Sequence, residues 1–273
     1  MKILIAADME GITGVVHWDQ VNPSHPEYAR FRHLMTGDVN AAIRGAFAGG
    51  ATSVSVTDGH HAGRNILIEE LDERAVLNSG TPAPLSMVHG VDQGAEGVIF
   101  VGYHGRIGAR SAILDHTWSD ERLANLWIND RLFGESGLNG AVCGHFNVPV
   151  IMISGDQTVC AEARDFFGDV ETVATKQAIG RMAAECLPPA VTGRMIEEAA
   201  KRAAERLAGR ESPSPFKLPS PITMVLEFVQ SEMADKAMIL PGAERLEDRK
   251  VRYSADDMVT IYFAFRTLLA LAR

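Results

Sequence analysis

The sequence predicts an α/β fold: a mainly parallel sheet flanked by helices, with a smaller C-terminal α+β region. Two observations predict it. Short apolar runs rich in β-branched residues recur between residues 3 and 174, and amphipathic helical patterns lie between them. Strands that alternate with helices are joined by right-handed crossovers, so the sheet should be largely parallel and covered on both faces.

The strands of this sheet are expected at runs that end mostly in Gly, Asp or His, as buried strands of a parallel sheet commonly do. Helices are expected at 36–48 and 156–167, where Asp156 can cap the first turn. A long amphipathic helix is predicted at 192–207. The predicted strands are 3–7, 53–57, 98–101, 148–153 and 170–174.

A different pattern begins after residue 125. Two apolar stretches around Asn129-Asp130, within 126–133, predict a hairpin that protrudes from the parallel sheet. Residues 209–221 contain four prolines and three serines, which is typical of a linker.

Strands are predicted again at 222–228 and 250–253. Ser254-Ala-Asp-Asp257 should open a C-terminal helix in the manner of a capping box. We therefore predict two domains: residues 1–190 form the α/β catalytic domain with the metal site, and residues 191–273 form the smaller α+β domain.

Charge and hydropathy exclude several classes of partner. The chain has a formal net charge of −9 and no basic stripe, so nucleic acid is not expected as a partner. The apolar run at the N-terminus is interrupted by Asp8 and Glu10 before a signal peptide or membrane span could form. We expect a cytoplasmic protein with no membrane partner.

Candidate metal ligands follow three successive predicted strands. The strands end in Asp8-Met-Glu10-Gly, Asp58-Gly-His60-His61 and Gly102-Tyr-His104-Gly. Ligands bind at the carboxyl ends of parallel strands, and zinc accepts imidazole nitrogen and carboxylate oxygen. A two-metal hydrolytic site needs several such groups and a bridging carboxylate. The residues that meet this need are Asp8, Glu10, His60, His104 and the nearby Glu135.

Other interpretations of these residues stay open. A single Asp at a strand end is more often a helix cap, and a single His more often makes only a hydrogen bond. His61 could replace His60 as the ligand. An alternative enzyme is a haloacid-dehalogenase-like phosphatase using Asp8 and Mg, but that chemistry gives no reason for His60 and His104. A nucleotide-binding protein is also considered, although both glycine-rich phosphate fingerprints are absent.

The chain resembles the D-aminopeptidase family of zinc peptidases, typified by the enzyme of bacterial dipeptide-transport operons. The resemblance extends from residue 1 to the C-terminus and includes Met238-Ile-Leu-Pro-Gly242. The segments that carry it are Asp8-Met-Glu-Gly-Ile-Thr-Gly14, Thr57-Asp-Gly-His60, Phe100-Val-Gly-Tyr-His104, Ile128-Asn-Asp-Arg131 and Gly134-Glu-Ser-Gly-Leu-Asn139.

This resemblance implies a dinuclear zinc aminopeptidase with two zinc ions per subunit. It implies that Asp8, Glu10, His60, His104 and Glu135 are the zinc ligands, with Asp8 as the bridge, and that His116 is catalytic. The implied substrates are short peptides with an N-terminal D-amino acid, attacked by a water that two metals activate. The implied assembly is a ring-like homo-oligomer. Glu10 or Asp58 is a candidate, by charge alone, to hold the substrate's free amine.

Overall fold

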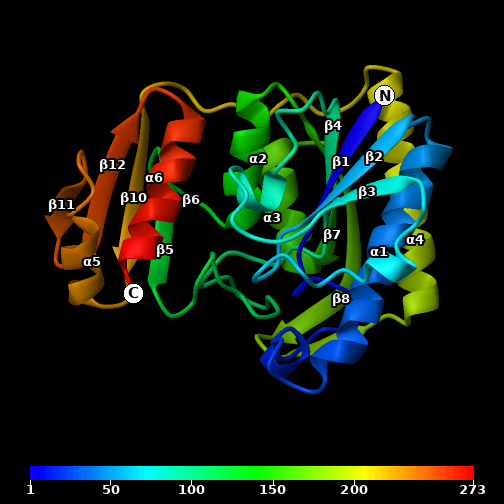
Figure 1. Ribbon diagram of the computed structural model, residues 1–273, viewed down its shortest axis with the longest axis horizontal. Coiled ribbons are helices and arrows are strands. Elements are labelled where there is room, and N and C mark those ends of the chain that lie inside the picture. The colour runs from blue at the N-terminus through cyan, green and yellow to red at the C-terminus, as the bar shows by residue number, and fades with distance from the viewer.

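The computed structural model describes residues 1–273 and contains two sheets (Figure 1). The first sheet has seven strands in the order β3-β2-β1-β4-β7-β8-β9, all parallel except β9, which runs antiparallel to β8. The predicted fold class is confirmed. The strands are β1 (Lys2–Ala7), β2 (Ser53–Asp58), β3 (Ala75–Asn78), β4 (Gly97–Val101), β7 (Val150–Asp156), β8 (Glu171–Gly180) and β9 (Ala183–Cys186).

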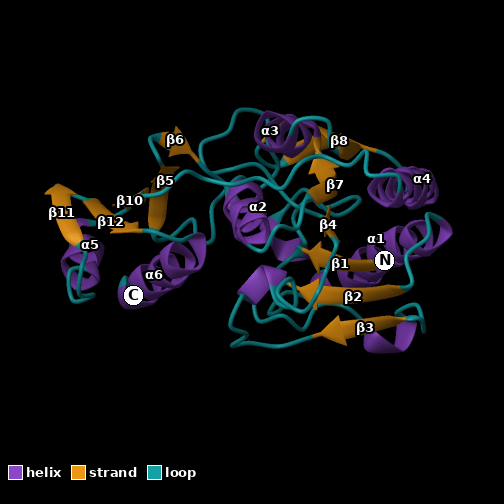
Figure 2. Ribbon diagram, turned by 90° about the horizontal axis from the view of Figure 1, so that it is seen from above, coloured by secondary structure: helices purple, strands orange, loops and turns teal.

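Side-chain alternation along β1 explains why helices cover both faces of this sheet. Ile3 and Ile5 pack with helices α1 (Tyr28–Ala48) and α4 (Pro189–Ala208) on one face. Leu4 packs on the other face, in the apolar cluster that includes α2 (Glu135–His145) and α3 (Gln157–Phe167). Figure 2 shows these two helix pairs on opposite sides of the strands.

The second sheet is antiparallel and has the order β11-β12-β10-β5-β6. The predicted hairpin is present, because β5 and β6 pair antiparallel, but its predicted location was wrong. It does not protrude from the first sheet and instead forms one end of the second. Its elements are β5 (Leu123–Ile128), β6 (Arg131–Leu132), β10 (Ile222–Phe228), β11 (Glu244–Glu247) and β12 (Lys250–Ala255), with helices α5 (Ser231–Ala237) and α6 (Met258–Leu271).

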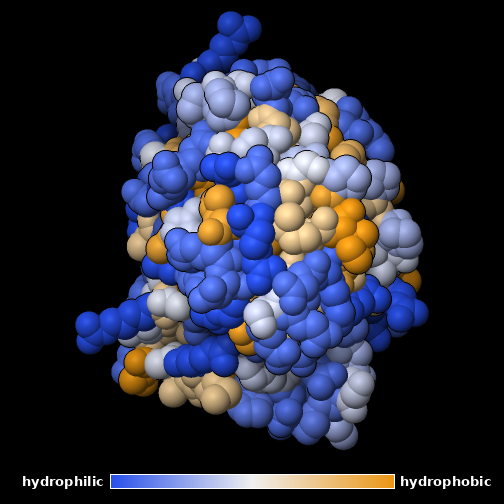
Figure 3. Space-filling model, turned by 90° about the vertical axis from the view of Figure 1, so that its left-hand side faces the viewer, coloured by the Kyte–Doolittle hydropathy of each residue, from blue (hydrophilic) through white to orange (hydrophobic).

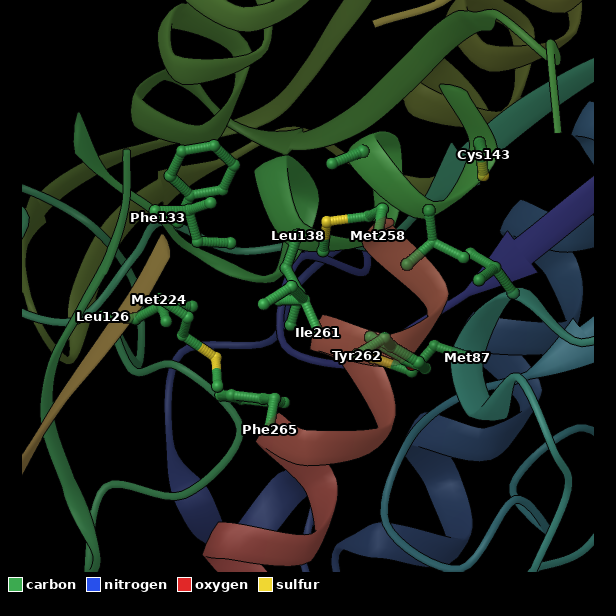
Figure 4. Packing of buried hydrophobic residues seen from close by; sticks show 14 of the residues in the cluster. Met87, Leu126, Phe133, Leu138, Cys143, Met224, Met258, Ile261, Tyr262 and Phe265 are labelled. Atoms are coloured by element: carbon green, nitrogen blue, oxygen red, sulfur yellow. The ribbon is translucent and has the colours of Figure 1, made fainter. Parts of the chain in front are cut away.

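The two sheets do not follow the predicted division at residue 190. Strands β5 and β6 lie before that boundary but belong to the second sheet, whereas α4 lies after it and packs on α1 of the first sheet. One continuous apolar cluster also joins the sheets. Figure 4 shows Ile261, Tyr262 and Phe265 of α6 among Leu138 of α2 and Met224 of β10.

Helix boundaries agree with the sequence only in part. Asp156 caps α3 as predicted, because its carboxylate accepts hydrogen bonds from the backbone N–H groups of Thr158 and Val159. The C-terminal helix differs: Ser254 remains in β12, and Asp257 is the N-cap of α6. Three short 3₁₀ helices complete the chain: Trp18–Gln20, Ile68–Glu70 and Ser86–Val88.

The end of the molecule that carries β11 and α5 is largely hydrophilic, with a few apolar side chains gathered near the middle of this view (Figure 3). None of the helices combines the length and the apolar character that a membrane crossing requires.

Candidate metal centre

The topology of the first sheet brings the predicted ligands together. Strands β2, β1 and β4 are neighbours, so their carboxyl ends lie side by side. Asp8 follows β1, His60 follows β2 and His104 follows β4. Glu135 is the first residue of α2.

Asp8 lies between two imidazoles and presents one oxygen to each. Its Oδ1 is 3.3 Å from His60 Nδ1, and its Oδ2 is 3.4 Å from His104 Nε2. Each imidazole also faces a second carboxylate: His60 Nδ1 is 3.2 Å from Glu10 Oε2, and His104 Nε2 is 3.2 Å from Glu135 Oε1. All five predicted ligands therefore meet in one place.

Several atoms of this cluster are buried without a hydrogen-bond partner. They are Asp8 Oδ2, Glu10 Oε2 and His104 Nε2. Buried polar atoms are nearly always satisfied, and a buried carboxylate without compensation is costly. A cation coordinated by these oxygen and nitrogen atoms would satisfy all three. The donor set is one that zinc accepts.

Backbone carbonyls fix how the imidazoles present their nitrogens. His60 Nε2 lies 2.8 Å from the carbonyl oxygen of Val21, and His104 Nδ1 lies 3.0 Å from that of Gly105. A carbonyl oxygen only accepts, so each of these nitrogens must carry the proton. The opposite nitrogens, His60 Nδ1 and His104 Nε2, then direct their lone pairs into the cluster, as metal-binding histidines do.

The electrostatics of the cluster favour a cation. Burial alone would lower the pKa of His60 and of His104, but the neighbouring carboxylates together outweigh it, those of Glu10 and Asp8 at His60 and those of Glu135 and Asp8 at His104, so both pKa values lie well above the usual one. Burial also acts to raise the pKa of Asp8, yet the adjacent imidazoles of His104 and His60 together hold that pKa well below its usual value. The negative charge of these carboxylates stabilises protonated imidazoles in the absence of metal and would likewise stabilise bound metal cations.

His116 lies at the mouth of the cluster. Its side chain is 12% exposed, and its Nε2 is 3.6 Å from Glu135 Oε1. Its Nδ1 lies 2.9 Å from the carbonyl oxygen of Leu114, and because a carbonyl oxygen only accepts hydrogen bonds, Nδ1 must carry the proton and donate. Two groups of residues have possible ligand atoms close enough together to hold a metal ion, and both groups include His104. One group is Asp8, Glu10 and His104, and the other is His104, His116 and Glu135.

Two other candidates lie outside the cluster. The carboxylate of Asp58 accepts hydrogen bonds from the backbone N–H groups of Asn65 and Ile66 and from the Asn65 amide, so it holds a loop and is not free for a substrate amine. His61 adopts a left-handed backbone conformation with φ 50°, and its ring centroid lies 6.2 Å from that of His60. Neither His60 nor His61 belongs to the two groups, but His60 Nδ1 faces the carboxylates of Asp8 and Glu10, whereas the ring of His61 pairs with no carboxylate.

The loop that carries Asp8 and Glu10 is held by a residue that sequence reasoning missed. The buried ammonium of Lys176, on β8, donates to the backbone carbonyls of Glu10, Ile12 and Val15 at 2.7, 2.8 and 2.7 Å. Burial lowers the pKa of Lys176 to about 8. The sequence offers little signal for this role, because β8 also contains Glu171, Thr172, Thr175 and Gln177.

The same loop packs against the backbone that follows β4. A Cβ atom on Gly11 would lie 1.9 Å from the carbonyl oxygen of Tyr103, so only glycine fits this position.

The metal centre opens into a cleft of about 1080 Å³. Asp8, Glu10, His60, His116 and Glu135 line one side of it, and residues 118–122 and the outer face of α6 line the rest. This volume is in the range of small-ligand sites.

Comparison with known proteins agrees with this geometry. The model of the D-aminopeptidase family, peptidase family M55, matches residues 1–267. A D-aminopeptidase of Bacillus subtilis (strain 168) is 36% identical over 273 residues, covering 100% of this chain and 98% of the relative. The solved structure of the zinc-dependent D-aminopeptidase DppA from Bacillus subtilis, a self-compartmentalizing protease, is similar with a TM-score of 0.95 at 36% identity and covers 100% of this chain and 98% of its own. The chain belongs to the D-aminopeptidase family.

Proposed function

We propose that this protein is a zinc-dependent aminopeptidase that hydrolyses short peptides with an N-terminal D-amino acid. The observation that carries the proposal is the position of Asp8, whose two buried oxygens face the imidazoles of His60 and His104. A carboxylate placed in this way can serve two cations. The zinc-dependent relative supports the choice of metal.

The residues divide into two half-sites. Glu10 and His60 would hold one zinc ion, His104 and Glu135 would hold the other, and Asp8 would bridge them. Zinc, when bound, supplies a Lewis acid and makes water a nucleophile at neutral pH.

The protein positions these groups before any substrate arrives. The backbone N–H of Trp118 donates to Glu135 Oε1 at 2.7 Å, which fixes that carboxylate. Lys176 holds the loop of Asp8 and Glu10 through hydrogen bonds to its backbone carbonyls. Such preorganisation avoids reorientation during the reaction.

His116 is proposed as the catalytic proton carrier. Its Nδ1 proton is held by the carbonyl oxygen of Leu114, so its Nε2 is the atom free to accept or deliver a proton at the mouth of the metal centre. A general acid–base role at this atom would assist departure of the amine product.

Assembly into a ring-like homo-oligomer is also part of the proposal. The self-compartmentalizing relative supports it. So does the β8–β9 hairpin, which exposes Ile179, Met182 and Leu187 at 68%, 49% and 39%. Clustered exposed apolar side chains commonly mark protein interfaces. The cytoplasmic location stays a prediction, which cell fractionation would test.

A phosphatase that uses Asp8 and Mg is not favoured. Both oxygens of Asp8 face imidazoles, which an aspartyl-phosphate mechanism does not require. A phosphate-ester assay separates the two functions.

The test combines metal analysis with an assay on matched D- and L-aminoacyl peptides. We expect two zinc ions per chain, hydrolysis that a chelator abolishes, and faster turnover of the D-peptide. A protein without stoichiometric zinc, or hydrolysis that survives chelation, would refute the metal assignment. Equal turnover of both peptides would refute the D-selectivity alone.

A further inference from the structure

The wall of the cleft opposite the metal centre is one face of α6. Five residues of this helix line the cleft; one is Leu269, and the other four have the spacing i, i+3, i+4 and i+7, which places them on a single face. The other face is anchored in the core, as Figure 4 shows for Ile261, Tyr262 and Phe265. The cleft-facing residues are Phe263, Arg266, Thr267 and Ala270.

Arg266 is held rigidly on this face. Its Nη1 donates to the backbone carbonyls of Ala83 at 3.1 Å and Pro84 at 2.5 Å, and its guanidinium lies over the ring of Tyr262, 5.8 Å from the centroid. No carboxylate of the chain pairs with it. All its hydrogen bonds use Nη1, so Nε and Nη2 keep N–H groups available for a ligand in the cleft.

A second arginine lines the same cleft. Arg122, next to β5, uses Nη1 to donate to the carbonyl of Leu269 on α6 at 3.4 Å and also has no carboxylate partner. Two acidic residues, Asp120 and Glu121, line this part of the cleft as well. Arg181 lies 3.6 Å from Asp120 and offsets its charge.

The two walls of the cleft therefore differ. Bound zinc would compensate the buried carboxylates of Asp8, Glu10 and Glu135, so the orientation of a peptide follows from the proposed aminopeptidase reaction, which brings its N-terminal residue to the metal centre. The α6 wall offers two guanidinium groups without a carboxylate partner. A short peptide bound in this orientation would direct its C-terminal carboxylate away from the metal centre and toward this wall.

We propose that Arg266, assisted by Arg122, binds the C-terminal carboxylate of the substrate. This inference rests on the proposed function and narrows its substrate class to short peptides with a free C-terminal carboxylate. Guanidinium–carboxylate hydrogen bonds are charge-assisted and geometrically specific, so they suit this recognition. Arg266 is a specificity-determining residue and takes no part in bond cleavage.

The test compares kcat/KM for D-alanylglycine and D-alanylglycinamide, which differ only in the C-terminal group. We expect the wild-type protein to prefer the free acid by about 10- to 100-fold, the range of a charge-assisted hydrogen bond. Arg266→Met should lose this preference by slowing turnover of the acid while leaving that of the amide unchanged. Arg266→Lys should restore part of it. Arg194→Met, at an exposed position of α4, is the matched control and should keep the full preference.

The outcomes separate the inference from the proposed function. If both peptides are hydrolysed equally by the wild-type protein, the inference is wrong and the aminopeptidase assignment stands. If neither is hydrolysed by the zinc-loaded protein, the proposed function fails. A variant that slows both peptides equally would assign Arg266 a structural role and overturn the inference. Even if a variant misfolds, the wild-type comparison can still overturn the inference.

Discussion

The imidazoles of His104 and His116 stack face to face, with ring centroids 4.0 Å apart and an interplanar angle of 10°. Their Nε2 atoms both face Oε1 of Glu135, at 3.2 and 3.6 Å. The His104 side chain is 1% exposed and that of His116 is 12% exposed. This difference is why we propose His104 as a metal ligand and place His116 on the substrate side.

Replacement of His116 tests that assignment. His116→Ala should lower kcat by about 10²- to 10⁴-fold, because a general acid–base group is lost, while zinc content stays at the wild-type level. Metal analysis and steady-state kinetics on the same sample check both expectations. Loss of one zinc ion per chain would instead make His116 a ligand, as one of the two groups allows.

Asp8 should control the occupancy of both half-sites. Asp8→Ala removes the oxygens that face His60 and His104, so zinc content should fall for both ions together and hydrolysis should be lost. Plasma emission spectrometry after dialysis measures the metal. Asp165→Ala, at a side chain that is 76% exposed, is the control and should bind zinc normally. Full zinc content in Asp8→Ala would contradict a bridging role.

Lys176 should couple stability to metal affinity. Lys176→Met leaves three backbone carbonyls without their hydrogen-bond donor. We expect the free energy of unfolding to fall by about 2–4 kcal/mol. The loss is smaller than the sum of three charge-assisted hydrogen bonds, because the wild-type protein also bears the cost of burying the ammonium group. Chemical denaturation of the metal-free protein measures this loss.

Zinc competition against a chelator should show weaker binding in Lys176→Met, because the loop of Asp8 and Glu10 is no longer tethered. Lys201→Met, at a side chain that is 51% exposed, should change neither quantity. Unchanged zinc affinity in a destabilised Lys176→Met would confine this lysine to a structural role.

Asp38 should make stability depend on pH. Burial raises the pKa of this α1 carboxyl from 3.8 to about 6, although hydrogen bonds from Thr13 act against the rise. The folded state therefore binds a proton more tightly than the unfolded state. Stability falls as pH rises from 3.8 to about 6, and the full penalty of about 3 kcal/mol persists above that range.

Asp38→Asn lacks this penalty and keeps an acceptor for Thr13. Relative to the wild-type protein, its stability should rise between about pH 3.8 and about pH 6 and stay higher by a constant amount above that range. Denaturant titrations of both metal-free proteins across that range provide the measurement, with Asp165→Asn as the exposed control. A stability difference that does not vary with pH would show that Asp38 stays ionised throughout.

The parallel sheet, and the edge of it where the candidate metal ligands lie, could be predicted from the sequence. Buried parallel strands are continuous apolar runs, and the residues directly after each run lie at one edge of the sheet. Asp8, His60 and His104 could therefore be placed on one rim from the order of the residues alone. Glu135 could be proposed only from its residue type and its position directly after the predicted hairpin, and the role of His116 came only from the family resemblance, because neither residue follows a strand of that sheet.

Other features depend on contacts that local pattern does not encode. Helix α2 contains Gly137, Gly140 and Gly144, which are poor helix formers. A Cβ atom on Gly140 would lie 2.4 Å from the ring of Phe167, so packing, not propensity, requires that glycine. The second-sheet position of β5 depends on its pairing with β10, far along the chain. Lys176 likewise acquires its role only when β8 meets the loop after β1.

The exchange of strands between the two sheets limits how the cleft can move. The chain passes from one sheet to the other three times, after β4, after β6 and after α4. Besides these three connections, one apolar cluster of 41 buried residues spans both sheets, and a large apolar interface opposes relative motion of two bodies. Substrates should thus enter an aperture of nearly constant width, and the length of peptide accepted is set by the shape of the protein at rest.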